Sequence, residues 1–248
     1  SPTRRASCAP RRMAKREHHV IDLCEEEPKD QQKRPCKDHI DLLDEAPAPQ
    51  MPVAAPRAVE EAPVAQSAGG GVHYVDLPRG VLDAQLQAAA IVQQCNCVGI
   101  DCRGLAAAIE QQLSYGNPYV QRRKQAVGKL AIPEDRPVPG SVDIRWPPQG
   151  VRGPVVINFF SQYEMGKALK YNRARPPGGA IDSEGQRREW FQMCLDELGR
   201  TNSSLSPIAF PHNIGCGLAG GRWSDYEQMI KDFASKHPAV SVLIVRQC

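Results

Sequence analysis

The chain has 248 residues, of which 24% are charged, with a formal net charge of +3 and nine cysteines. A net charge this small, with both signs mixed, argues against a protein that binds nucleic acid electrostatically. Nine is an odd number and no two cysteines form a C-x-x-C pair. We therefore expect free thiols in a reducing compartment, with no disulfide framework, no metal site and no bound cofactor.

Nothing in the sequence indicates a membrane segment or a secretory leader. No apolar stretch approaches the roughly 18 residues that span a bilayer, and the charged start lacks the apolar core of a signal peptide. We expect a soluble intracellular protein that does not meet a membrane. Because the chain begins at Ser1 rather than Met, we interpret it as a processed or engineered product.

Composition divides the chain into two parts. Residues 1–71 are rich in Pro, Ala, Glu, Lys and Arg and contain no Trp, Tyr or Phe. Such a segment cannot bury enough apolar surface to offset its ordering entropy, so it is predicted to be a disordered arm. Residues 72–248 hold all the aromatic residues and are long enough for one core. We expect one folded domain with a tail, acting as a monomer.

The folded part alternates between strand and helix patterns. Strands are predicted at Val72–Leu77, within Ala89–Val98, and at Ser141–Trp146, Pro154–Phe160, Pro207–Phe210 and Val240–Val245. Helices are predicted at Gly104–Leu113, just after Asn117 with Pro118 in the first turn, from an N-cap at Ser183 to a terminating Gly199, and from a capping box of Ser224 and Glu227 to Lys236. This alternation predicts an α/β fold, with a mostly parallel or mixed sheet between helices.

The most informative stretch is the glycine-rich loop Ile214–Trp223 (IGCGLAGGRW), between a strand and a helix. Glycines permit positive φ and let backbone N–H groups approach an anion, and the start of a helix adds partial positive charge. The loop therefore predicts a diphosphate cradle, although a turn that only reverses the chain is the alternative. It matches neither the P-loop nor the dinucleotide fingerprint, since it has no Gly-Lys-Ser/Thr and lies near the C-terminus.

The run PHNIGCGLAGGRW resembles the second ligand loop of macrodomains, especially the branch of terminal ADP-ribose glycohydrolase and the ADP-ribose 1″-phosphate phosphatases. Three further segments agree in order. Val75-Asp76-Leu77 is similar to the opening strand, IVQQCNCVGIDCRGLAAAI to the first phosphate loop and its helix, and VVINFFSQ to the strand that leads to the distal ribose. The resemblance implies a three-layer α/β/α macrodomain with a mixed sheet over residues 72–248. It also implies that ADP-ribose, or an ADP-ribosylated protein, is the ligand.

The resemblance also assigns roles to particular residues. Asp76 would accept a hydrogen bond from the adenine amine, or else be a solvated turn residue, and Asn96 would orient the distal ribose, or else satisfy a turn. Phe160 and Gln162 would lie near ribose or adenine, although a Phe at the end of an apolar strand suits the core equally well. The diphosphate would lie between two groups of residues: Cys102, Arg103, Gly104 and Leu105 on one side, and Gly215, Cys216, Gly217, Leu218, Ala219, Gly220 and Gly221 on the other.

Catalysis is where this sequence departs from the glycohydrolase pattern. There, a lysine attacks the sugar and an aspartate follows GCGL, whereas here Ala219 holds the aspartate's position. The lysine region YVQRRKQAVGK offers Lys124 or Lys129. His212 is a candidate general acid or base, or else a histidine that satisfies a strand end, and Cys216 is expected to pack rather than to react. The sequence leaves both a hydrolase of ADP-ribosyl linkages or of ADP-ribose 1″-phosphate and a non-catalytic reader open.

The arm carries two segments that resemble SUMO-interaction motifs, at residues 19–27 and 39–45. Each has an apolar core beside acidic residues: Val20, Ile21, Asp22 and Leu23 in the first, and Ile40, Asp41, Leu42 and Leu43 in the second. Such a core adds as a strand to the edge of SUMO while acids meet its basic rim, and two linked copies would favour SUMO chains. The alternative is a solvated linker. Basic pairs at Arg4-Arg5, Arg11-Arg12 and Lys15-Arg16 are typical of a nuclear localisation signal, so we expect a nuclear or nucleocytoplasmic protein.

Overall fold

The computed structural model describes residues 71–201 and 205–248. The predicted disordered arm and the two SUMO-interaction motifs therefore lie outside the described residues, apart from Gly71 at the end of the arm.

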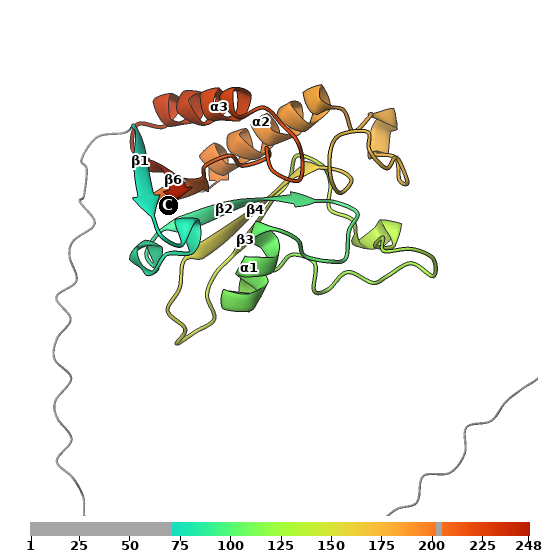
Figure 1. Cartoon of the computed structure of the whole chain (residues 1–248), viewed down its shortest axis with the longest axis horizontal. Helices are drawn as coiled ribbons and strands as arrows, with labels where there is room; N and C mark the ends of the chain where they lie inside the picture. The colour runs from blue at the N-terminus through green and yellow to red at the C-terminus, as the bar shows by residue number, and fades with distance from the viewer. Residues whose placement is uncertain (1–70, 202–204) are drawn as a thin grey trace, which may run out of the picture. The chain divides into compact units, whose positions relative to one another are not determined.

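A six-stranded sheet runs through the described domain in the order β1-β6-β5-β2-β4-β3 (Figure 1). The strands are β1 (Val72–Leu77), β2 (Ala90–Asn96), β3 (Val142–Arg145), β4 (Val155–Gln162), β5 (Ile208–Pro211) and β6 (Val242–Gln247). Neighbouring strands pair in parallel, except that β3 pairs antiparallel to β4. The predicted mixed sheet is confirmed. The carboxyl ends of the five parallel strands meet at one edge, where open α/β sheets place their ligands.

Helices cover both faces of the sheet (Figure 1). The helices α2 (Glu184–Thr201) and α3 (Trp223–Lys236) pack on one face, and α1 (Leu105–Gln112) packs on the other with two 3₁₀ turns, Gly80–Leu82 and Ala84–Leu86. The three-layer α/β/α arrangement is confirmed.

Each face of the sheet has its own hydrophobic core, and successive residues of a central strand pack into opposite cores. On β2, Val92 packs toward α2 and α3, whereas Ile91 packs toward α1. On the α2 side, the ring of Phe159 meets Phe191 and Phe210 edge to face, with centroid distances of 5.4 and 6.2 Å. All six strands were predicted within two residues of their ends. For β4, β5 and β6, burial on both faces over most of the strand produces a largely apolar run that is visible in the sequence.

The short helix predicted after Asn117-Pro118 is wrong. The chain forms a 3₁₀ turn before this point, at Ser114–Gly116, and residues 118–121 form bends and turns. The side chain of Asn117 accepts a hydrogen bond from the backbone N–H of Tyr119 at 2.7 Å. Pro118 therefore lies in a turn that the Asn117 side chain closes, and not in the first turn of a helix.

The long helix α2 begins as predicted and does not end as predicted. Ser183 Oγ accepts a hydrogen bond from Gln186 N at 3.1 Å, which confirms the N-cap. Gly199 lies inside the helix, which continues to Thr201, so the prediction that this glycine terminates the helix is wrong. A Cβ at Gly199 would lie 2.3 Å from Nε2 of His237. Glycine is needed here because the end of α3 packs closely against α2.

The capping box predicted at Ser224 and Glu227 is also wrong. Arg222 is the N-cap of α3 and makes no side-chain capping hydrogen bond, so Ser224 lies inside the first turn. Asp225 instead forms a two-bond ion pair with Arg222, with both N–O distances 3.0 Å. The negative charge of Asp225 in the first turn interacts favourably with the helix dipole of α3. This stabilises the start of the helix without a capping box.

Candidate functional site

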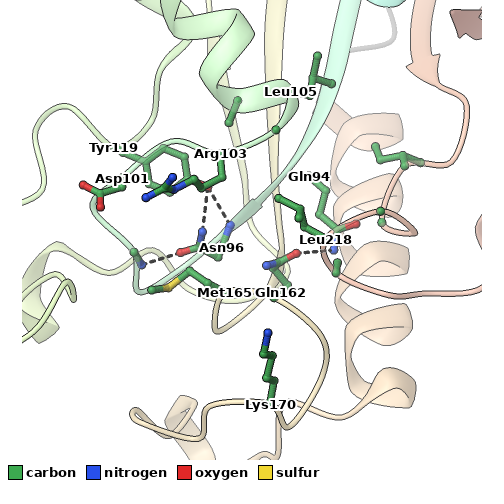
Figure 2. Close-up of a pocket in the computed structure, with 18 of the residues that line it drawn as sticks. Gln94, Asn96, Asp101, Arg103, Leu105, Tyr119, Gln162, Met165, Lys170 and Leu218 are labelled. Carbon is green, nitrogen blue, oxygen red and sulfur yellow. Dashed lines mark hydrogen bonds between the residues drawn. The ribbon is translucent and has the colours of Figure 1, made fainter.

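A cavity of about 760 Å³ opens at the carboxyl ends of β2, β4 and β5 (Figure 2). One wall is the end of β2 with residues 99–106, a second is the loop 211–219 after β5, and a third is the loop 165–173 after β4. Tyr119 and Lys129 complete the lining. Two loops were predicted from the sequence to hold the diphosphate: residues 102–105 before α1 and residues 215–221 after β5. Both loops contribute to the lining of this one cavity, and we call them the two glycine loops.

The loop after β5 needs glycine at Gly215. Its φ is 76°, and an added Cβ would lie 2.4 Å from Oε1 of Gln94 and 2.8 Å from Cζ of Tyr226. By contrast, an added Cβ at Gly217 would meet no atom within 4 Å, so this residue faces open space in the cavity wall. The loop closes on itself through a hydrogen bond from Gly221 N to Gly215 O at 2.9 Å.

Both glycine loops present backbone N–H groups without acceptors. Within the described residues, no hydrogen-bond acceptor is recorded for the N–H groups of Gly217, Leu218 and Ala219 in the loop after β5. The same holds for Cys102, Arg103 and Gly104, which precede α1. Backbone donors of this kind on facing loops form an anion-binding arrangement, which α1 supports with its N-terminal dipole.

The turn after β2 is built around Asn96. Its Oδ1 accepts a hydrogen bond from Gly99 N at 2.6 Å, and its Nδ2 lies 3.2 Å from the hydroxyl of Tyr119. The guanidinium of Arg122 donates to the carbonyls of Asn96 and Gly99 at 3.0 and 2.8 Å and lies 4.4 Å from the centroid of the Tyr119 ring. Asn96 therefore satisfies the turn, as one of the two readings proposed, while its side chain also lines the cavity.

The loop 165–173 is a wall that sequence reasoning missed. Arg187 of α2 is only 2% exposed and pairs with Asp182 through both carboxylate oxygens, at 2.7 and 2.6 Å. The same guanidinium donates to Gly166 O at 2.7 Å and to Ala219 O at 3.3 Å. Since Gly166 and Ala219 both line the cavity, one buried side chain joins this loop to the glycine loop after β5.

A buried carboxylate, that of Glu164, also holds the loop 165–173 in place. Glu164 is 3% exposed, and it accepts hydrogen bonds from Arg173 N at 2.8 Å and Arg173 Nε at 2.5 Å. A second missed residue, Gln94, donates to Oε1 of Gln162 at 3.2 Å across the floor of the cavity (Figure 2). The pair of glutamines that interrupts the apolar start of β2 was the signal for Gln94. The loop 165–173 carries no motif.

The cavity has a surplus of positive charge. Its lining contains the cations Arg103, Lys129, Lys170 and Arg173 and one carboxylate, Asp101. Lys129 pairs with Asp101 at 3.4 Å, and Arg173 pairs with Glu164 behind the wall. Arg103 and Lys170 have no ion-pair partner in the described part of the chain, and Figure 2 shows them on opposite sides of the cavity.

The cavity brings together eleven of the residues proposed from the sequence. They are Asn96, Arg103, Gly104, Leu105, Lys129, Gln162, His212, Gly215, Gly217, Leu218 and Ala219. The backbone N–H of His212 donates to Val245 O at 2.8 Å, and its ring packs edge to face on Trp223 at 4.8 Å between centroids. Only the backbone of His212 therefore pairs at the strand end, while the residue also lines the cavity.

Seven proposed residues lie outside the lining: Lys124, Asp76, Cys102, Phe160, Cys216, Gly220 and Gly221. The carboxylate of Asp76 pairs with Arg246 through bonds of 2.6 and 2.9 Å. Phe160 is 5% exposed and belongs to a core cluster, and Lys124 forms an isolated bridge with Ala131.

The four remaining residues, Cys102, Cys216, Gly220 and Gly221, belong to the two ligand loops but are not part of the lining. Added Cβ atoms at Gly220 and Gly221 would meet the stem of Lys167 at 2.8 Å and the ring of Tyr226 at 2.6 Å. Burial raises the pKa of the Cys102 thiol to about 12 and that of Cys216 to about 11. Both cysteines are therefore protonated at neutral pH, which does not suit a nucleophile.

The described residues contain neither a candidate metal site nor a helix suited to a membrane. Among residues 71–201 and 205–248, no group of three or more His, Cys, Asp or Glu side chains is placed to hold a metal ion. Within the same ranges, no helix has the length and apolar character needed to cross a bilayer.

No family model and no curated protein matches this sequence. Among solved structures, the chain is similar to the macrodomain of DarG from Mycobacterium tuberculosis, at 20% identity over 70% of this chain and 97% of that chain, with a TM-score of 0.47. It is similar to the macrodomain of Thermus aquaticus DarG at 19% identity over 70% and 98% of the two chains, with a TM-score of 0.48. A Bacteroides thetaiotaomicron protein of unknown function is similar at 22% identity over 71% and 98%, with a TM-score of 0.47.

Proposed function

We propose that the chain is a macrodomain and that the cavity binds ADP-ribose, either free or attached to a protein. The observation that carries this proposal is the pair of glycine loops, whose backbone N–H groups without acceptors face one cavity. Arg103 and Lys170 add two cations without ion-pair partners among the described residues. A diphosphate supplies two negative charges and several acceptor oxygens, which matches both features.

In this proposal the diphosphate lies between residues 102–105 and residues 217–219. The two loops approach each other there, because an added Cβ at Gly104 would lie 3.5 Å from Cδ1 of Leu218. The distal ribose would lie toward Asn96. The adenine would lie toward Asp76. The Asp76 carboxylate now accepts hydrogen bonds from Arg246, and it would accept one from the adenine amine either in addition to these or in their place.

Titration of the full chain with ADP-ribose tests the proposal. We expect one site per chain by calorimetry and a raised melting temperature, because a ligand that binds only the folded state stabilises it by about 2.7 kcal/mol at 100 times Kd. A flat calorimetric trace together with an unmoved melting curve at millimolar ADP-ribose would exclude the cavity as an ADP-ribose site.

The adenine contact is tested by comparing Asp76→Ala with Arg246→Ala. Loss of one charge-assisted hydrogen bond should weaken ADP-ribose binding by roughly 1.5 to 3 kcal/mol in Asp76→Ala. Arg246→Ala removes the ion-pair partner and leaves the carboxylate for adenine, so its affinity should be unchanged or higher. Equal losses in both variants would mean that the ion pair matters only for the fold.

A second candidate function is hydrolysis of an ADP-ribosyl linkage or of ADP-ribose 1″-phosphate. The observation that favours it is that His212 and the Asp101–Lys129 pair line the same cavity, so groups able to exchange protons lie near the proposed ligand. Incubation with a mono-ADP-ribosylated protein and with the 1″-phosphate tests turnover. Binding without product release would identify a reader or an adaptor.

For the arm, we propose SUMO binding from the sequence alone, because residues 1–70 lie outside the described residues. Val20, Ile21 and Leu23 would be the principal anchors of a strand added to SUMO, with micromolar or weaker affinity for one motif. NMR titration of the labelled full chain with SUMO tests this, with alanine replacements of these three residues as the comparison. The absence of any shift between residues 18 and 27 would leave the arm a linker. Nuclear localisation is proposed on the same basis, from the basic pairs.

A further inference from the structure

A segment with a locally high positive charge lies beside the cavity, and we call it the rim segment (residues 165–181). It contains Lys167, Lys170, Arg173 and Arg175 and no Asp or Glu. The chain as a whole has a formal charge of +3, so the residues outside the rim segment sum to −1. The near-neutral total therefore conceals a local surface that attracts negative charge.

Some residues of the rim segment line the cavity and others are exposed outside it. We call the exposed residues that do not line the cavity the outer side. Lys170, Tyr171 and Arg173 line the cavity, and the rim segment leads from the end of β4 to the start of α2 (Figure 1). Lys167 and Arg175 are exposed, do not line the cavity, and have no ion-pair partner among the described residues. These two cations are not needed for a ligand inside the cavity.

The outer side also exposes apolar side chains. Leu169 is 58% exposed and Ile181 is 64% exposed. The hydrogen bond from Leu169 N to Asp182 O, at 3.2 Å, brings Leu169 close to the residue that follows Ile181, and Leu169 is held there at a φ of 60°. A leucine with positive φ is an unusual choice for a solvated loop, where Asn or Gly would adopt this conformation at lower energy.

We propose that the outer side of the rim segment docks an acidic polypeptide segment with aliphatic residues, namely the part of an ADP-ribosylated protein that flanks the modified residue. The positive charge of the outer side favours a negatively charged partner. Because the same segment also lines the cavity, a partner bound there would lie beside an ADP-ribose held in the cavity. The exposed Leu169 and Ile181 favour a polypeptide over nucleic acid, because a phosphodiester backbone offers aliphatic side chains little apolar area to bury. This inference rests on the proposed ADP-ribose site and adds the class of substrate that the site receives.

The test uses the full chain and three probes: free ADP-ribose, and two peptides with ADP-ribose on the same serine. One peptide is flanked by Glu and Leu, and the other by Lys and Ser. We expect the acidic peptide to bind about tenfold more tightly than free ADP-ribose, since a few exposed charge pairs each contribute a fraction of 1 kcal/mol. This advantage should shrink as salt is raised, because exposed charges are screened within about 10 Å.

Two double variants separate the charged from the apolar contribution. Lys167→Gln with Arg175→Gln removes the outer cations while Gln keeps the stem that packs near Gly220, and Leu169→Asn with Ile181→Thr removes the apolar pair. Each should reduce the advantage of the acidic peptide by the contribution that it removes and leave the affinity for free ADP-ribose unchanged. The matched control is Arg152→Gln with Arg200→Gln, which removes two exposed cations outside the cavity lining and the rim segment.

The outcomes are distinct. If free ADP-ribose does not bind, the proposed function is overturned, and the docking inference, which rests on it, is overturned with it. If ADP-ribose binds and both peptides bind with equal affinity, or if the control variant loses the advantage as well, the docking inference is overturned. If a single-stranded oligonucleotide displaces the acidic peptide and binds more tightly through Lys167 and Arg175, the partner is nucleic acid and the polypeptide assignment is wrong.

Discussion

At the scale of single residues, the glycines of the loop after β5 have different tasks. Gly215 has positive φ and close neighbours, whereas Gly217 faces open space. The sequence shows four equivalent glycines in this loop, and only their surroundings distinguish those that shape the backbone from the one that leaves room in the cavity. Substitutions at the two positions should therefore fail in different ways.

Gly217→Glu should leave the domain folded and weaken ADP-ribose binding by at least about 100-fold, since it places bulk and like charge beside the diphosphate. Gly217→Ala adds only one uncharged methyl group, for which there is space, so as the control it should retain most of the binding. Gly215→Ala should instead destabilise the fold by about 2 kcal/mol or more, because of positive φ and overpacking against Tyr226. Circular dichroism melts and calorimetry check both variants, and wild-type affinity in folded Gly217→Glu would refute the placement of the diphosphate.

His212 and Lys124 are the two proposed catalytic residues, and they lie in different places. His212 lines the cavity and Lys124 does not. Should turnover be found, His212→Ala should reduce kcat by about 10²-fold or more, the range of general acid–base catalysis, while Lys124→Ala should leave it unchanged. Lys129→Ala is the informative comparison, because Lys129 lies in the cavity. A larger loss in either lysine variant would restore the lysine mechanism.

At the scale of elements, Arg187 couples α2 to two loops. Its guanidinium holds Gly166 and Ala219 together from behind the cavity and pairs with the nearly buried Asp182. The loop 165–173 has no regular secondary structure and owes its shape to this contact and to Glu164. The position of that cavity wall is therefore decided by a helix that follows it in the chain.

Arg187→Met should destabilise the fold by about 3 to 5 kcal/mol, since it leaves the Asp182 carboxylate buried and unpaired. Arg187→Met with Asp182→Asn should recover part of this stability. The double variant should still bind ADP-ribose more weakly and show faster amide exchange in residues 164–173, because the link between the loops is absent. Arg188→Met, on the exposed neighbour that pairs with Asp225, is the control. Wild-type exchange rates and affinity in the double variant would mean that Arg187 serves stability only.

At the scale of the whole molecule, buried thiols link stability to alkaline pH. Burial raises the pKa of Cys95 to about 12, as it does for Cys102, and raises that of Cys216 to about 11. In the unfolded chain a cysteine ionises near pH 8.5, so above this pH the unfolded state holds fewer protons than the folded one. Stability from these groups is fully present below about pH 8.5 and is lost as the pH rises toward the folded values.

We therefore expect the free energy of unfolding in urea, with a reductant present, to fall between pH 8 and pH 10. The fully buried Cys95 alone contributes a slope of up to about 1.4 kcal/mol per pH unit above its unfolded pKa. Cys95→Ala should make the decline less steep by about this amount, even if it lowers stability at every pH. A free energy that is flat or rising over this range would contradict the prediction.

Much of the fold could be predicted from the sequence, because its signals are local. Strands buried on both faces produce apolar runs, the N-cap at Ser183 depends on a side chain three residues from its partner, and glycine loops are visible as composition. Those features place the glycine loops at one edge of a mixed sheet. The predicted helix after Pro118 and the capping box at Ser224 failed because local hydrogen bonds and ion pairs that compete with them have similar energies.

Only the tertiary structure decided the rest, because the interactions responsible join distant residues. The sequence alone determined the α/β class, the strands and the position of both glycine loops. It did not reveal that Gly199 makes room for His237, that Asp76 pairs with Arg246, or that Arg187 builds a third wall of the cavity. Each of these depends on which surfaces meet when helices pack on the sheet. No short-range pattern encodes such a contact, since a buried pair leaves no periodicity in either partner's own segment.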